Sequence, residues 1–153
     1  MQGHEIKEII QNIPSLVSSF KGIYSIDTLP VSLEKRTFII SNTDVQSGQG
    51  KHWICFARID KGIEVFDSLG FTEEKKKLLQ KYCKFLRFKV LKFNDTRVQS
   101  FTSPSCGLFA LYFAIHRFGN LDLGFKTLLN EIFETNTNLN EIQVQDFIKQ
   151  FLK

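Results

Sequence analysis

The most apolar stretch of the chain begins at Leu108 and continues as Phe-Ala-Leu-Tyr-Phe-Ala to Ile115. Its alanine and leucine residues favour a helix, and Gly119-Asn120 follows as a helix end. The stretch is shorter than the ~20 apolar residues that cross a bilayer. A helix that is apolar on every face has to lie inside a protein core. We therefore expect a buried central helix through about Phe118, with the other elements packed around it.

The length and composition are typical of a globular domain. The 153 residues are 42% hydrophobic and 24% charged, and they fit one domain, residues 1–153. Three cysteines, an odd number, argue against a disulfide framework and favour a reducing compartment. Residues 1–5 lack the features of a signal peptide, so we expect no secretion and no membrane partner. Collagen-like, disordered, membrane-spanning and disulfide-rich classes are excluded.

Periodic patterns predict helices around a small sheet. Isoleucines at helical spacing open the chain, and Pro14 either breaks that helix or begins a second turn through Phe20. Residues 22–30 are expected to form a loop. The expected helices are 6–13, 72–86 with Thr72 as cap, 125–134, and 139–153 with Asn138 or Asn140 as cap; the expected strands are 36–42, 52–59, 63–67 and 88–93. This order predicts an α+β fold: a small mixed, mostly antiparallel β-sheet flanked by helices.

Residues 52–67 have the pattern of a β-hairpin that turns at Asp60-Lys61-Gly62. His52 opens its first strand and Asp67 ends its second, so both lie at the same end. If they pair directly across the ladder, their Cβ atoms are about 5 Å apart. We expect the carboxylate to bind Nδ1 of the imidazole and to leave Nε2 free to accept a proton. The alternative is an incidental surface pair.

Cys106 follows a Ser/Pro-rich loop and begins the buried helix. A helix N-terminus carries about half a positive charge and several unpaired N–H groups, which favour a thiolate and can hold an oxyanion. Gly107 beside it leaves room for a substrate carbonyl to approach. Cys106 is therefore the candidate nucleophile, and the alternative is a buried free cysteine without a chemical role.

His52 is the histidine best placed to serve this thiol. His4 is terminal, and His116 lies ten residues further along the helix of Cys106, about 15 Å away at a rise of 1.5 Å per residue. Gln99, seven residues before Cys106, can donate a second hydrogen bond to an oxyanion. The cysteines and histidines lack the spacing of a metal site, so we expect no metal.

Positive charge is concentrated in residues 71–93. This segment holds eight lysines and arginines against two glutamates, whereas the whole chain has a net charge of +4. A basic face can attract DNA or an acidic partner, and the alternative is a solvated helix face. The candidates for nucleic-acid binding are Lys75, Lys76, Lys77, Lys81 and Lys84.

Three motifs resemble the adenovirus proteinase family: Asn42-Thr43 ahead of Gly50-Lys51-His52-Trp53, then Phe66-Asp67-Ser68-Leu69-Gly70-Phe71, then Gln99-Ser100-x-x-Ser103-x-Ser105-Cys106-Gly107-Leu108-Phe109. The family belongs to the cysteine-protease clan that includes the SUMO-deconjugating proteases. Its order of His, acid, Gln and Cys is the reverse of the papain-like order. The resemblance covers residues 22–118. The compact chain, residues 22–25 and Leu29-Pro30 look most like the proteases of virophages and of Maverick/Polinton-type elements.

The resemblance implies a cysteine endopeptidase with a Cys-His-Asp triad. It assigns Cys106 as the nucleophile, His52 as general base and acid, Asp67 as the group that orients the imidazole, and Gln99 as the oxyanion donor. The adenovirus enzyme has a glutamate as its acid, so the aspartate here is one methylene shorter. Trp53 would flank the substrate cleft, and the alternative for it is packing within the hairpin.

The same resemblance predicts a viral maturation protease. It would cleave capsid precursor proteins through a thioester intermediate, after Gly-Gly or Gly-x-Gly motifs. It implies no required cofactor, with stimulation by DNA or by a viral peptide; neither Cys55 nor Cys83 aligns with the cysteine that tethers that peptide, which favours DNA. We expect a monomer in the virion and the host-cell interior, in cytoplasm or nucleus. The alternatives are a protease that removes ubiquitin-like tags such as SUMO, and a non-catalytic capsid or DNA-packaging factor.

Overall fold

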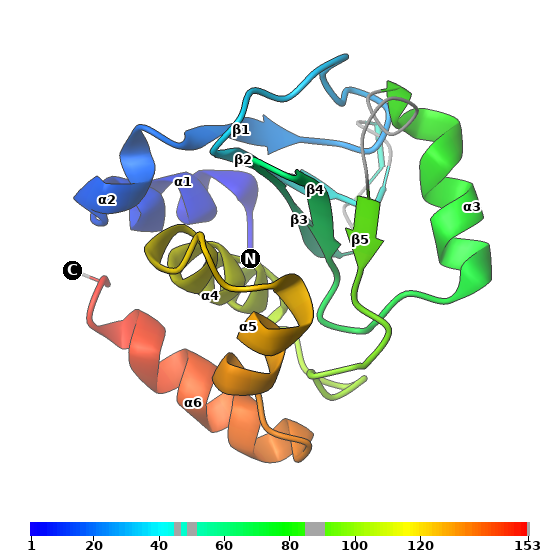
Figure 1. The fold of residues 1–153 in the computed structure, drawn as a ribbon. Coiled ribbons are helices and arrows are strands. Elements are labelled where there is room, and N and C mark those ends of the chain that lie inside the picture. The colour runs from blue at the N-terminus through cyan, green and yellow to red at the C-terminus, as the bar shows by residue number, and fades with distance from the viewer. Residues whose placement is uncertain (45–46, 49–51, 85–90, 153) are drawn as a thin grey trace.

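The computed structural model describes residues 1–44, 47–48, 52–84 and 91–152 (Figure 1). Five strands form one mixed sheet, β1 (Phe20–Tyr24), β2 (Thr37–Asn42), β3 (Trp53–Ile59), β4 (Gly62–Phe66) and β5 (Leu91–Phe93). The helices are α1 (Gly3–Gln11), α2 (Pro14–Val17), α3 (Glu73–Tyr82), α4 (Cys106–Gly119), α5 (Phe125–Ile132) and α6 (Thr137–Lys149). The predicted α+β class is confirmed.

The strand order in the sheet is β1-β2-β3-β4-β5. The central strand β3 is antiparallel to both of its neighbours, β2 and β4, whereas the outer strands β1 and β5 each run parallel to their neighbour. The predicted hairpin is formed by β3 and β4, and its two turn residues are Asp60 and Lys61. Because side chains alternate across a strand, β3 contributes Ile54 and Phe56 to one face of the sheet and Cys55 and Ala57 to the other.

Helix α4 fills the centre of the larger core, as the apolar stretch predicts. It packs across β3 and contacts α1, α5 and α6, and Phe109, Leu111 and Phe113 are fully buried (Figure 1). Helix α3 lies on the opposite face of the sheet, where Leu79 packs in a second apolar cluster. No helix in the described part of the chain is long and apolar enough to cross a membrane.

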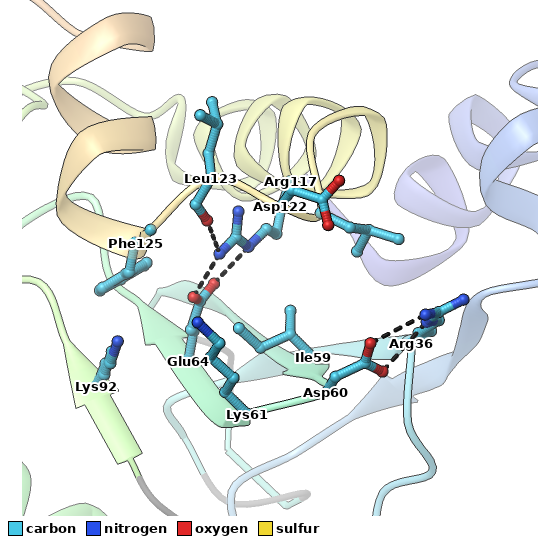
Figure 2. A pocket seen from close by; sticks show the side chains of 12 residues that line it. Arg36, Ile59, Asp60, Lys61, Glu64, Lys92, Arg117, Asp122, Leu123 and Phe125 are labelled. Carbon is cyan, nitrogen blue, oxygen red and sulfur yellow. Dashed lines mark hydrogen bonds and ion pairs between the residues drawn. The ribbon is translucent and has the colours of Figure 1, made fainter.

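A buried ion pair joins the far end of α4 to the sheet. The Arg117 guanidinium donates from Nε and Nη2 to the two Glu64 carboxylate oxygens at 2.8 and 2.7 Å, and both side chains are at most 1% exposed (Figure 2). Its remaining contacts are the carbonyls of Asn120 at 2.9 Å and Leu123 at 2.8 Å. The pair therefore fixes α4 relative to β4 and fixes the loop that follows α4.

The prediction of a loop at residues 22–30 is wrong for residues 22–24, which belong to strand β1. Ile23 lies opposite Ile40 of β2, with an irregular register between Phe20 and Ile23. Gly22 lies within that irregularity at φ +124°, a conformation that favours glycine. Ile23 and Tyr24 favour a strand, but Gly22 weakens that signal, so the pairing with β2 decides the structure of this stretch.

The predicted caps of the last helix, Asn138 and Asn140, are also wrong. Asn136 is the N-cap, because its Oδ1 accepts the backbone N–H groups of Asn138 and Leu139 at 2.9 and 3.3 Å. Asn140 is instead fully buried, and its side-chain amide donates to the carbonyl of Val98 at 3.0 Å. Several asparagines in this region can cap a helix, and the sequence alone does not rank them.

The predicted helix 72–86 ends earlier, at Tyr82, because Cys83 has an extended backbone and its side chain is buried. Leu86, the predicted end, and residues 88–90 of the predicted strand 88–93 lie outside the described residues. Helices α5 and α6 likewise end before their predicted boundaries.

Replacing Arg117 with methionine should destabilise the fold by about 3–5 kcal/mol, because it leaves the Glu64 carboxylate buried without its partner. The free energy of unfolding in urea measures this loss. Arg36→Met is the matched control: its ion pair with Asp60 is 64% and 57% exposed, and such surface pairs contribute ~0–1 kcal/mol. Equal losses for the two variants would contradict a structural role for the buried pair.

Candidate active site

The end of the β3–β4 hairpin brings His52 and Asp67 into contact. The His52 Nε2 atom lies 2.5 Å from Asp67 Oδ1, and the two side chains are 14% and 4% exposed. They are not directly paired as the sequence analysis predicts. The ladder pairs Cys55 with Phe66, so its continuation would place Asp67 opposite Ile54, and His52 reaches the carboxylate diagonally.

The orientation of the imidazole also differs from the prediction. Nε2, rather than Nδ1, faces the carboxylate, so Nδ1 is the ring nitrogen left for the Cys106 thiol, with which His52 is hydrogen-bonded. Burial lowers the pKa of His52, but the hydrogen bonds to Asp67 and Cys106 and their charges outweigh burial and raise it to about 9. His52 is therefore protonated at neutral pH.

A dense set of contacts holds Asp67 in place. Asn94, itself buried, accepts the Asp67 N–H at 2.9 Å and donates to the Asp67 carbonyl at 2.6 Å. The carboxylate also accepts the N–H of Leu69 at 2.8 Å and the Lys75 ammonium at 3.2 Å. Burial raises the pKa of Asp67, but the interactions with His52, Lys75 and Leu69 bring it below the usual aspartate value. Asp67 is thus a fixed anion.

Cys106 is the first residue of α4, as the sequence predicts, and it is partly exposed. Burial raises the pKa of its thiol, but the hydrogen bond and charge of His52 and the backbone N–H groups of Trp53 and Gly107 lower it below the ordinary value. A depressed thiol pKa beside a raised imidazole pKa favours a thiolate–imidazolium pair. The contribution of the Trp53 backbone requires the hairpin to lie against α4 and has no sequence signal.

Gln99 lies where the loop before α4 passes the hairpin. Its side chain is 1% exposed; Oε1 accepts a hydrogen bond from the Ser68 hydroxyl, and Nε2 donates to the Ser103 carbonyl at 3.0 Å. The amide is therefore held rigidly and has a second N–H group. Gln99 lines the same cavity as Cys106 and His52, which has a volume of about 380 Å³.

Gly107 and Trp53 pack against each other and against Met1, and the sequence analysis anticipates packing only for Trp53, within the hairpin. A Cβ atom at Gly107 would lie 3.0 Å from Met1 Sδ and 3.3 Å from Trp53 Cδ1, so these two side chains pack closely against the glycine, whose role beside a substrate stays a prediction. The Trp53 indole N–H donates to the Met1 carbonyl at 2.9 Å. Trp53 also lines the cavity around Cys106, so packing and a place beside the cleft are both present.

Phe101 has no role in the sequence analysis, yet it lines the same cavity and is 74% exposed. The Arg97 guanidinium lies 4.0 Å from its ring centroid and donates to the Gln99 carbonyl at 2.8 Å. A large apolar ring is thus held in solvent at the rim of the cleft. The position of Phe101, two residues after Gln99, is the signal that could have identified it.

A comparison with protein-family models identifies the family of this chain. The model of the adenovirus endoprotease family matches residues 20–151, most of the chain. The chain belongs to the adenovirus endoprotease family. It is therefore a cysteine peptidase, and its substrates are proteins. No curated protein sequence matches the chain.

Comparison with solved structures finds a shared fold in the first of the following three, and all three have low sequence identity to this adenovirus endoprotease family member. The central domain of the uncharacterized Lpg1148 protein from Legionella pneumophila is 14% identical, with a TM-score of 0.52 over 99% of this chain and 97% of that one. The ASFV pS273R protease is 20% identical, with a TM-score of 0.44 over 76% and 44% of the two chains. A single-residue deletion variant of AvrA, solved with IP6 and CoA, is 19% identical, with a TM-score of 0.47 over 88% and 53%.

The other two histidines of this endoprotease do not line the cavity around Cys106. His4 is exposed, and His116 packs against Tyr112 and Phe147, where burial lowers its pKa. Within the described ranges no group of three or more histidine, cysteine or acidic residues could hold a metal ion.

The lysines of the predicted basic face of the endoprotease divide into two that contact carboxylates and three that are more exposed. Lys75 contacts Asp67, and Lys76 pairs with Glu73 at 3.2 Å and Asp95 at 3.6 Å. The more exposed set is Lys77, Lys81 and Lys84.

Alkylation of Cys106 by iodoacetamide, followed against pH by mass spectrometry, should become fast below the ordinary thiol pKa, because His52 stabilises the thiolate. His52→Ala should move the rate profile to higher pH, since it removes a hydrogen bond and a positive charge. The internal control is Cys83, which is buried with its pKa raised to about 12 and should react slowly. An ordinary thiol profile that His52→Ala leaves unchanged would contradict the ion pair.

Proposed function

We propose that this chain is a viral cysteine endopeptidase that cleaves capsid and other virion precursor proteins. The observation that carries the proposal is the continuous contact from Asp67 through His52 to Cys106, with Gln99 in the same cavity. The arrangement supplies an ionised nucleophile, a proton donor and a rigid amide. We further propose that residues 1–153 act as one protease domain.

The proposed reaction is acyl transfer. The Cys106 thiolate attacks the scissile carbonyl, and the new oxyanion accepts hydrogen bonds from the Cys106 backbone N–H at the start of α4 and from the Gln99 amide. His52 gives its proton to the leaving amine, which leaves a thioester on Cys106. The neutral imidazole then takes a proton from water, the hydroxyl attacks the thioester, and the acid product leaves the thiolate restored. Asp67 keeps the ring oriented through both steps.

The shape of the cleft supports substrates with small residues at the cleavage site. Trp53 and Phe101 both line the cavity that holds Cys106, and these two large rings would restrict the substrate side chains that can enter it. A glycine-containing motif, either Gly-Gly or Gly-x-Gly, would let the substrate backbone approach the thiolate. The proposed setting is the virion and the host-cell interior, with the enzyme acting as a monomer.

Two rival functions use the same fold. A protease that removes ubiquitin-like tags would have the same catalytic residues, so only the substrate distinguishes it. A non-catalytic capsid or DNA-packaging factor would not need Cys106 to be partly exposed beside a raised-pKa imidazole, and these features favour the enzyme.

Cleavage of two fusion proteins would separate the candidate substrates. One fusion carries a capsid-precursor segment with a Gly-x-Gly motif, and the other carries an intact ubiquitin-like domain with its Gly-Gly end. We expect a higher kcat/KM for the capsid fusion. Faster cleavage of the ubiquitin-like fusion would favour the deconjugating function, and cleavage of neither would contradict a peptidase with these specificities.

Two variants test the assigned chemistry in the same assay. Cys106→Ala should retain the fold and abolish cleavage, because no other group replaces the thiolate. Gln99→Ala should lower kcat by about 10²–10³, the usual effect of losing one oxyanion donor. Circular dichroism checks that both variants fold, since Gln99 is buried. Residual cleavage by Cys106→Ala would refute the assignment of the nucleophile.

DNA stimulation through the basic face is a second proposal, supported by the exposure of Lys77 and Lys81 on α3 and of Lys84 just after it. Lysine contacts to phosphates release counterions, so stimulation should weaken as salt rises. The rate of peptide cleavage with and without duplex DNA, measured over a series of salt concentrations, checks this. A rate that depends on neither DNA nor salt would contradict it.

A further inference from the structure

Lys75 contacts the carboxylate that faces His52. Its ammonium donates to Asp67 Oδ2 at 3.2 Å and to the Gly70 carbonyl at 2.9 Å, while the other carboxylate oxygen, Oδ1, faces the imidazole. The lysine side chain is 40% exposed and the Asp67 side chain 4%. The lysine that the sequence assigns to a DNA-binding face thus places its charge on the candidate acid.

The turn between Asp67 and α3 fixes the backbone position of Lys75 relative to the Asp67 carboxylate. The N–H of Gly70 donates to the Asp67 carbonyl at 2.8 Å, and Gly70 has φ +81°. A Cβ there would lie 2.8 Å from the Asp95 carbonyl oxygen, so only glycine fits. Thr72 caps α3 by accepting the backbone N–H of Lys75 at 3.2 Å. The lysine therefore starts from a backbone position that the turn determines.

We propose that Lys75 is a positioning residue for the proposed triad: it binds the second oxygen of Asp67 and so prevents the carboxylate from rotating away from His52. A carboxylate that is hydrogen-bonded at both oxygens has one orientation, and it passes that orientation to the imidazole. This inference rests on the proposed function, because it concerns the same site.

The charge of Lys75 helps to lower the pKa of Asp67, and we expect it to act on the other titrating groups of the site as well. The charged and titratable groups around the site are His52, Asp67, Cys106 and Lys75, with Asp44 and Tyr82 lining the cavity on the α3 side of the hairpin. A nearby ammonium disfavours the imidazolium and favours both the carboxylate and the thiolate. Its removal should therefore shift both limbs of the pH–rate profile to higher pH.

The test compares Lys75→Met, Lys75→Arg and the control Lys126→Met, in the absence of DNA. Lys126 is an exposed lysine on α5, which lies on the other side of the sheet from α3 (Figure 1). Lys75→Met should lower kcat about three- to tenfold with little change in KM, the range expected for one partly exposed charged hydrogen bond. It should also shift the pH profile upward. Lys75→Arg should restore most of the rate, and Lys126→Met should match the wild type.

Two results would overturn the role of Lys75: a rate and pH profile equal to those of Lys126→Met, or a lower rate with an unshifted profile, which indicates structural damage alone. The alkylation rate of Cys106 against pH reads the same shift without any substrate. If the wild-type protein cleaves no substrate while Lys75→Met still shifts the alkylation profile, the proposed function fails and the role of Lys75 stands.

Discussion

Burial of helix α4 is the constraint on which the site depends. Its side chains are apolar on nearly every face, so the helix has to lie between the sheet and the other helices. The Arg117–Glu64 pair fixes its C-terminal end to β4. Once the helix is fixed across β3, its first residue, Cys106, has to lie beside the end of the hairpin, where His52 and the Trp53 N–H meet the thiol.

The pKa values in the site depend on burial and on the short distances between its ionisable groups. Burial by itself would neutralise each of the three groups Asp67, His52 and Cys106. Hydrogen bonds and neighbouring charges oppose this effect: they hold the pKa of Asp67 and of Cys106 below the ordinary values and raise the pKa of His52 to about 9. In the proposed reaction, the raised pKa of His52 places a proton on the group that would deliver it to a leaving amine.

Residues outside the group of Asp67, His52 and Cys106 hold Asp67 in place. Asn94 binds the backbone of Asp67 from the segment after β5, and Lys75 binds its carboxylate from α3. These contacts join the end of the hairpin to two segments that follow it in the sequence. A site built in this way holds its geometry before a substrate arrives, which is what electrostatic stabilisation of a transition state requires.

The sequence by itself determined what depends on local pattern: the apolar period of α4, the hairpin of β3 and β4, and the order of His52, Asp67, Gln99 and Cys106, which resembles the adenovirus proteinase motifs. Tertiary structure decided the features that depend on distant partners. These include strand β1, which forms only against β2, the choice of Asn136 as a cap, and the imidazole nitrogen that faces Asp67. It also decided that Lys75 reaches the carboxylate, because local composition shows that the segment is basic but not where each lysine side chain points. The backbone turn before α3 and the packing of α3 on the sheet set that direction, and no pattern of neighbouring residues encodes either.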